Sequence, residues 1–276
     1  MKKFVKAFLT GICLLFVGNC IYLYNVQDSL IFAYKRLPKN HQFEMSAPFE
    51  ERTYAVDQGI NLSALYFPSQ SKEEVKGVVL CFHGRGTNIG RDWGKTSTYF
   101  TSLGYDFIVY DYRGFGKSDG SISTKNICSD PMKMVEIISS EYRDKKLIVY
   151  GCSLGTFFAT YVSSIKKPDA MILEAPFYSM LDMACLTKPY IPRFLLQKIL
   201  KYPLKTNCYI KKVDCPILIF HGTEDETVPF CESVRLFDII KHKTSNQFIK
   251  IESANHSNLS NSPLYAESIE NFVSEL

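Results

Sequence analysis

The chain has 276 residues, of which 46% are hydrophobic and 22% charged, and its formal net charge at pH 7 is +4. This length and composition predict a folded protein with a sizeable core and exclude an intrinsically disordered chain. The basic residues form no block with interleaved aromatic residues, so nucleic acid is not expected as a partner.

The nine cysteines form no metal-binding or disulfide pattern. Their number is odd, no Cys-x-x-Cys occurs, and several lie inside predicted core strands, where cysteine packs as a small hydrophobic residue. We therefore expect buried free thiols, although the spacing leaves a Cys208–Cys215 disulfide open. The sequence implies no metal ion and no organic cofactor.

The first predicted element is a membrane helix. Three lysines within the first six residues precede Ala7–Tyr24, an uncharged stretch of 18 residues, which is close to the minimum for crossing a bilayer. Tyr22 and Tyr24 at its end are typical of an aromatic anchor at the interface and not of a signal-peptide cleavage site. We predict an uncleaved single-pass membrane anchor over residues 1–27 and a connecting arm over residues 28–50.

The side of the membrane is left open. The lysines before the stretch favour a cytosolic N-terminus, with the domain outside the cytosol. Lys35, Arg36 and Lys39 behind the stretch weaken this asymmetry, and free cysteines are more typical of a reducing compartment.

Residues 51–276 are predicted to form an α/β domain with a mostly parallel, twisted sheet of about eight strands. Glu51–Asp57 and Ile60–Pro68 alternate as an antiparallel pair, and from Lys76 on short continuous apolar strands alternate with helices. Such strands belong to a sheet covered by helices on both faces. The later strands are expected at Gly77–Phe82, Asp106–Tyr110, Lys146–Tyr150, Ala170–Leu173, Pro216–Phe220 and Gln247–Ile251. The helices are expected at Trp93–Leu103, Cys128–Tyr142, Leu154–Ser164, Cys231–Lys241 and Pro263–Glu275.

Residues 180–210 interrupt this alternation. The segment is apolar, contains three prolines and has Asp182 as its one acid. It is placed on the carboxyl edge of the sheet, where lids over active sites occur; the alternative is one extra packed helix. As a lid, it is expected to line a substrate pocket with Leu186, Tyr190, Phe194 and Leu195.

The segment Gly151-Cys152-Ser153-Leu154-Gly155 follows a predicted strand and precedes a predicted helix. Gly-x-Ser-x-Gly in this context is typical of a tight strand-to-helix turn that exposes the serine as a nucleophile. The backbone N–H of Leu154 then faces a developing oxyanion. In the loop His83-Gly84-Arg85-Gly86, the backbone N–H of Arg85 is the best candidate for a second donor.

A serine nucleophile needs a base, and the base needs an orienting acid. Among the five histidines, His256 alone follows the last predicted strand and gives the chain order Ser, acid, His. Asp225, in the loop after Pro216–Phe220, is the best candidate for the acid, and Glu174 is a less favoured substitute. His83 and His221 each end a strand and are expected to shape loops, as is the glycine-rich segment Asp111–Gly120.

Taken in order, the motifs HGRG, DYRGFGKSDG, GCSLG, HGTEDETVP and ANHSN resemble the α/β-hydrolase superfamily over residues 50–276. The N-terminal anchor and the motifs QDSLIF and EAPFYS are similar to the membrane-anchored serine hydrolases of the serine aminopeptidase-like group, which includes depalmitoylase-type members. The family more often carries Asn or a small residue where Arg85 stands.

The expected activity is cleavage of carboxylic esters or thioesters through an acyl-enzyme, with Ser153 as nucleophile, His256 as base and Asp225 as orienting acid. The substrate is expected to be a small molecule, a lipid or an acylated protein at the membrane. A chain that begins near Asp28 is expected to be soluble and active. The alternatives are a peptidase or acyltransferase on the same residues, or a non-catalytic membrane-bound scaffold. The oligomeric state is not predicted.

Overall fold

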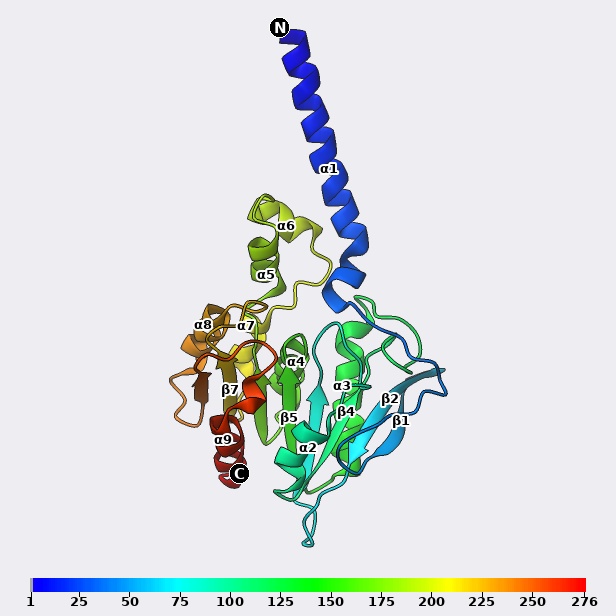
Figure 1. Ribbon diagram of the computed structural model, residues 1–276, viewed down its shortest axis with the longest axis vertical. Helices are drawn as coiled ribbons and strands as arrows, with labels where there is room; N and C mark the ends of the chain where they lie inside the picture. Colours follow the sequence, from blue (N-terminus) through cyan, green and yellow to red (C-terminus); the bar gives the residue numbers. More distant parts are fainter. Residues whose placement is uncertain (1) are drawn as a thin grey trace.

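The domain is built on one eight-stranded sheet with the strand order β1-β2-β4-β3-β5-β6-β7-β8. The computed structural model describes residues 2–276 (Figure 1). β1 and β2 pair antiparallel with each other and β2 with β4, while β3 to β8 pair parallel, which confirms the predicted sheet. The strands are β1 (Glu50–Asp57), β2 (Ile60–Phe67), β3 (Gly77–Phe82), β4 (Tyr105–Tyr110), β5 (Lys146–Cys152), β6 (Ala170–Glu174), β7 (Ile217–Gly222) and β8 (Gln247–Ile251).

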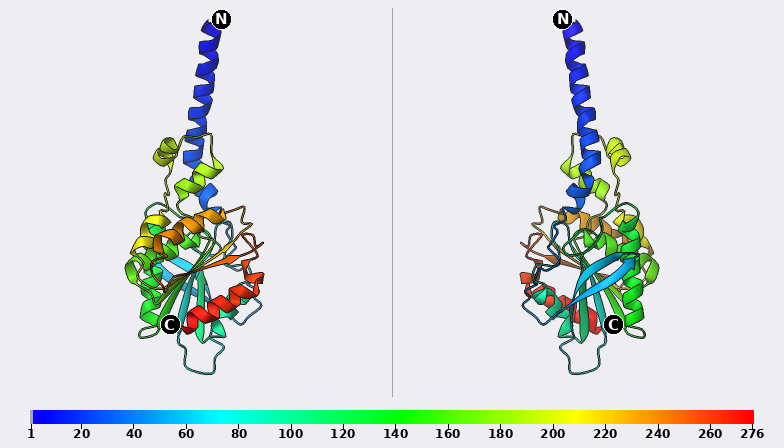
Figure 2. Two further views of the ribbon diagram at one scale, coloured as in Figure 1. Left: turned by 90° about the vertical axis from the view of Figure 1, so that its left-hand side faces the viewer. Right: turned by 90° about the vertical axis from the view of Figure 1, so that its right-hand side faces the viewer.

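Helices cover both faces of the sheet, as the continuous apolar strands require. One face carries α3 (Asn126–Glu141), α4 (Gly155–Lys166) and α8 (Phe230–Ile240). The other carries α2 (Gly94–Thr101) and α9 (Pro263–Ser274), so the core lies in two layers (Figure 2). All nine cysteines are free.

The interruption after β6 folds into two short helices, α5 (Met180–Thr187) and α6 (Arg193–Ile199), followed by α7 (Thr206–Tyr209) and the 3₁₀ turn Ile210–Lys212. We call residues 180–204 the lid. In Figure 1 and in both views of Figure 2, α5 and α6 lie beside the lower half of the N-terminal helix.

The N-terminal helix α1 runs from Lys2 to Phe32 and is long and apolar enough to cross a membrane. It therefore continues five residues into the segment predicted as a connecting arm. Its last two residues, Ile31 and Phe32, are buried in the domain core, and the Phe32 ring packs edge-on against Tyr202 with the ring centres 5.0 Å apart.

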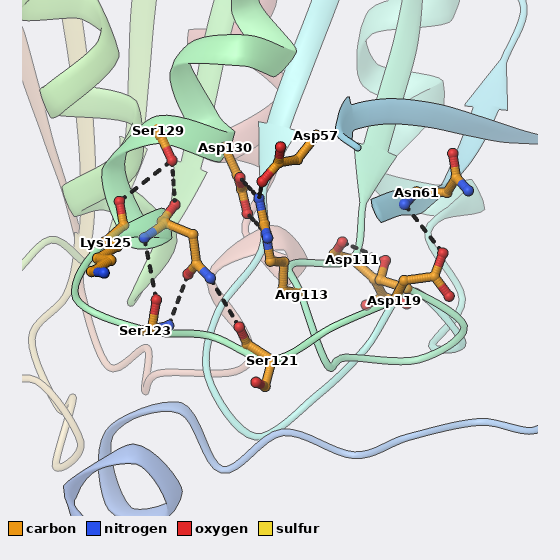
Figure 3. Close-up of polar contacts among 12 residues, drawn as sticks. Asp57, Asn61, Asp111, Arg113, Asp119, Ser121, Ser123, Lys125, Ser129 and Asp130 are labelled. Atoms are coloured by element: carbon orange, nitrogen blue, oxygen red, sulfur yellow. Dashed lines mark hydrogen bonds and ion pairs between the residues drawn. The ribbon is translucent and has the colours of Figure 1, made fainter. Parts of the chain in front are cut away.

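The glycine-rich loop after β4 is held by charged contacts (Figure 3). Arg113 donates from Nε and Nη2 to the carboxylate of Asp130 on α3, at 2.5 and 2.7 Å, and from Nη2 to Asp57 at the end of β1, at 3.2 Å. Asp119 accepts from the backbone N–H of Asn61 on β2, at 3.1 Å. These contacts join the loop to the edge of the sheet.

Candidate active site

Ser153 lies at the turn between β5 and α4, with φ at +51°. This left-handed backbone conformation is uncommon for a residue with a side chain. The glycines on either side are required by close approach: a Cβ on Gly155 would lie 1.9 Å from the carbonyl oxygen of Phe82, and a Cβ on Gly151 would lie 2.7 Å from the Cβ of Ala159. Packing of α4 against β3 and β5 therefore forces the turn that presents Ser153.

His256 lies beside Ser153 although the two residues are 103 positions apart. Its Nε2 is 3.0 Å from Ser153 Oγ, and its Nδ1 is 2.7 Å from Asp225 Oδ2. Because the carboxylate accepts the Nδ1 proton, Nε2 is left as the acceptor for the serine hydroxyl. The three residues predicted from chain order are thus brought together at the carboxyl edge of the sheet.

The carboxylate of Asp225 accepts three hydrogen bonds and lies close to a second histidine. Oδ1 accepts from the backbone N–H groups of Thr227 and Val228, both at 2.8 Å. Oδ2 accepts from His256 and lies 3.3 Å from Nε2 of His221. Burial alone would raise the pKa of Asp225, but the contacts with His221, His256 and Val228 outweigh it and hold that pKa below its ordinary value.

The other two strand-end histidines are buried and have other partners. His221 donates from Nε2 to the carbonyl of Val228 at 2.8 Å and contacts Ser233 through Nδ1. His83 donates from Nδ1 to the carbonyl of Gly84 at 2.8 Å and stacks on Tyr112 with ring centres 4.4 Å apart. Both shape their loops, and His221 also supports Asp225.

Glu174, the substitute acid, lies behind the turn. Its Oε2 accepts from Tyr265 Oη at 3.0 Å and from the hydroxyl of Tyr150. Its backbone carbonyl accepts from the N–H of Ser153 at 2.8 Å. Within residues 2–276, no hydrogen bond joins Glu174 to His256.

Arg85 and Leu154 line the cavity beside Ser153, and within residues 2–276 their backbone N–H groups donate to no other group. The Arg85 side chain has a separate role that the sequence did not indicate. Its Nη2 donates to the carbonyl of Leu30 at 3.0 Å, and the next N–H, of Gly86, donates to the carbonyl of Phe32 at 3.0 Å. A guanidinium at a helix C-terminus satisfies free carbonyls and complements the helix dipole, so this loop caps α1.

A cavity of about 320 Å³ opens beside Ser153. Three elements form its apolar walls. They are α1, through Leu23, Leu30 and Ile31; α5, through Met180, Met183, Ala184 and Thr187; and α6 with the residue after it, through Leu196, Ile199 and Leu200. Arg85 and Lys188 are the charged residues of the lining within the described chain.

The four lid residues predicted to line the pocket do not line this cavity. Leu186, Tyr190 and Phe194 are 52%, 56% and 62% exposed, and Leu195 packs on the outer side against α1. Successive residues of an α-helix are turned by about 100°, so on α5 the residues Met180, Met183, Ala184 and Thr187 span an arc of about 100° and Leu186 lies outside it. The pocket therefore takes Met180, Met183, Ala184 and Thr187 from α5, and Leu186 points away.

The contribution of α1 to the pocket was missed by sequence reasoning. Gln27, 7% exposed at the end of the apolar stretch, makes two hydrogen bonds to the lid. A buried amide at the end of an otherwise apolar helix is the one local signal of this contact.

Comparisons with known proteins find this chain similar to hydrolases. A family model described as serine aminopeptidase, S33, matches residues 73–207. The lysophosphatidylserine lipase ABHD12 of Danio rerio is 31% identical over 191 residues, which cover 63% of this chain and 50% of that protein. The chain thus spans about half the length of the curated relatives it matches.

Solved structures share the fold. The esterase Pf2001 of Pyrococcus furiosus superposes with a TM-score of 0.69 at 17% identity, covering 87% of this chain and 99% of that one. Est1E of Butyrivibrio proteoclasticus, solved with ferulic acid bound, gives a TM-score of 0.67 at 18% identity, covering 81% of this chain and 98% of that one.

Proposed function

We propose that the chain is a membrane-anchored serine hydrolase of the α/β-hydrolase superfamily that releases the acyl chain of single-chain anionic lipids. The observation that carries the proposal is the contact of Ser153 Oγ with His256 Nε2 at 3.0 Å, at the mouth of an apolar cavity. Residues 1–27, which include most of α1, are proposed as the membrane anchor.

The proposed chemistry runs through an acyl-enzyme. Ser153 Oγ attacks the ester carbonyl carbon while its proton passes to His256 Nε2, and the backbone N–H groups of Arg85 and Leu154 stabilise the oxyanion. The bond to the leaving alcohol then breaks, and His256 returns the proton to that alcohol. Water then attacks the carbonyl carbon of the acyl-enzyme while its proton passes to His256; the bond to Ser153 Oγ breaks, His256 returns the proton to that oxygen, and the free acid leaves. Asp225 holds the imidazole and its positive charge throughout.

The dimensions and charge of the cavity support the substrate class. A volume of about 320 Å³ is at the lower end of ligand pockets, about 300–1,000 Å³, which suits one acyl chain. Arg85 and Lys188 form no ion pair within residues 2–276, and the lining has no acid in that range. An apolar pocket beside two cations that have no acidic partner in the described part of the chain suits an amphiphile with an anionic head, and the name of the relative in Danio rerio, a lysophosphatidylserine lipase, agrees with this class.

The same charges argue against aminopeptidase activity. An aminopeptidase binds the protonated amino terminus of its substrate, and a cation requires an acidic partner. Arg85 and Lys188 would repel that group.

The test compares lysophosphatidylserine, lysophosphatidylcholine and an aminoacyl amide as substrates of the full-length protein in vesicles. We expect fastest release of fatty acid from lysophosphatidylserine and no cleavage of the amide. Lys188→Gln should raise KM for lysophosphatidylserine with little change in kcat, and Lys198→Gln, on the exposed side of α6, serves as its control. Preference for the amide would contradict the proposal.

A further inference from the structure

The outer side of the lid, which faces away from Ser153, has three notable features. It contacts α1, it exposes apolar side chains, and basic residues with no acid between them in the sequence lie on and after it.

The lid contacts α1 within its uncharged stretch. Phe16, Cys20 and Leu23 of α1 pack with Leu195, Leu196 and Ile199 of the lid. The hydroxyl of Tyr190 donates to Oδ1 of Asn19 at 3.3 Å, which gives a polar residue inside that stretch a partner. Because an α-helix rises about 1.5 Å per residue, the segment from Phe16 to Tyr24 is about 12 Å long. A hydrocarbon core is about 30 Å thick, so each leaflet contributes about 15 Å. The part of α1 that contacts the lid is therefore nearly as long as one leaflet is thick.

The contact is fixed by a buried amide. Gln27 Nε2 donates to the carbonyl of Ile199 at 2.7 Å, and Gln27 Oε1 accepts from the N–H of Lys201 at 2.8 Å. These bonds hold the end of α6 against α1 and so fix the position of the lid along the axis of α1.

The outer side of the lid is apolar. Leu186, Tyr190 and Phe194 expose more than half of their surface. A second cavity, of about 340 Å³, lies between α1 and α6 and is lined by Phe16, Val17, Cys20, Ile21, Tyr24, Leu195 and Ile199. Exposed apolar surface of this kind marks a protein or membrane contact, and here it continues the surface of the helix that is to cross the bilayer.

The charge of the lid and of the segment that follows it is one-sided. Between Met183 and Val213 the sequence has seven basic residues and no acid. They are Lys188, Arg193, Lys198, Lys201, Lys205, Lys211 and Lys212. Within residues 2–276, Arg193 pairs with Asp182 and Lys201 with Asp28, and the other five form no ion pair. Basic residues beside inserted apolar side chains are typical of proteins that bind anionic bilayer surfaces.

We propose that the lid is inserted in the same leaflet as the adjoining part of α1, with Phe194 and Leu186 among the lipid tails and the lysines at anionic headgroups. The active-site cavity then has walls from two membrane-embedded elements, so an acyl chain reaches Ser153 from the leaflet between α1 and the lid. This inference rests on the proposed membrane anchoring by α1 and adds the position of the lid.

The experiment measures quenching of tryptophan fluorescence by lipids brominated on their acyl chains. Full-length protein is reconstituted in vesicles of brominated phosphatidylcholine containing phosphatidylserine, and Phe194→Trp is compared with two reference variants. Leu15→Trp is on the exposed face of the uncharged stretch of α1 and reports the anchor itself. Ile165→Trp is an exposed apolar position at the end of α4, on the edge of the sheet away from the lid. The one native tryptophan, Trp93, is fully buried and supplies the baseline.

We expect Phe194→Trp and Leu15→Trp to lose most of their added emission in brominated vesicles and Ile165→Trp to lose none. Quenching of Leu15→Trp without quenching of Phe194→Trp would overturn the lid position and leave the anchor standing. Quenching of neither would overturn both. Each variant is repeated with Ser153→Ala, whose quenching should be unchanged; a failure of hydrolysis is thereby separated from a failure of insertion.

Discussion

The side-chain amide of Gln27 donates to the carbonyl of Ile199 at 2.7 Å, a contact between residues 172 positions apart that joins α1 to the lid. Because Leu23 and Ile31 of the same helix line the cavity beside Ser153, the helix that is to anchor the protein also forms part of its pocket. The proposed membrane anchoring and the proposed substrate binding therefore share this helix.

Replacing Gln27 should loosen the lid. Gln27→Leu leaves the carbonyl of Ile199 and the N–H of Lys201 without partners, at a cost of about 1–3 kcal/mol for each group that stays buried. We expect a higher KM for long-chain esters with a smaller change for acetyl esters. Asn25→Leu, which loses only a local bond to the carbonyl of Ile21, is the control. If the two variants have the same dependence of KM on ester chain length, the hydrogen bonds of Gln27 to the lid have no part in binding the acyl chain.

A chain that begins at Asp28 should label with a fluorophosphonate but hydrolyse long-chain esters poorly. Truncation removes Leu23 and Gln27 while leaving Ser153, Asp225 and His256 in place. The sequence predicts that such a chain is soluble and keeps esterase activity, and the structure limits this expectation to short-chain esters. The measurement is kcat/KM for acetyl and palmitoyl esters in full-length and truncated protein, and an unchanged ratio would restore the earlier expectation.

Filling the cavity from α5 should shorten the acceptable acyl chain. Met183→Trp places a large ring in the lining, so turnover of octanoyl and palmitoyl esters should fall while acetyl ester turnover is retained. Leu186→Trp, three residues on and pointing outward, should leave the profile near that of the wild type. If both variants behave alike, the cavity is not where the acyl chain binds.

The orienting carboxylate can be tested separately. Asp225→Asn should leave His256 in the wrong tautomer and reduce kcat by on the order of 10³–10⁴. Glu174→Gln disturbs only the contacts with Tyr150 and Tyr265 and should cost far less. The reverse ranking would reassign the acid.

Most of the sheet and the arrangement of Ser153, Asp225 and His256 were predictable because the signals are local. Continuous apolar runs mark buried parallel strands, and a glycine-flanked serine between strand and helix marks the turn. The inward face of the lid was not predictable, because α5 is apolar on most sides and its periodicity does not single out Met183 over Leu186. The contact of Gln27 with Ile199 depends on tertiary packing; a polar residue at the end of an apolar stretch signals that a partner exists but does not identify it.

The most direct test of the central claim is labelling and turnover of Ser153→Ala. Full-length protein in vesicles is treated with a fluorophosphonate probe and assayed for fatty acid release from lysophosphatidylserine. Thr156→Ala, which loses the bond of Thr156 Oγ1 to the carbonyl of Ser153, controls for damage to the turn. We predict that Ser153→Ala loses both labelling and fatty acid release while its circular dichroism spectrum stays that of the wild type, and that Thr156→Ala keeps both. Wild-type rates of release in a folded Ser153→Ala protein would contradict the account.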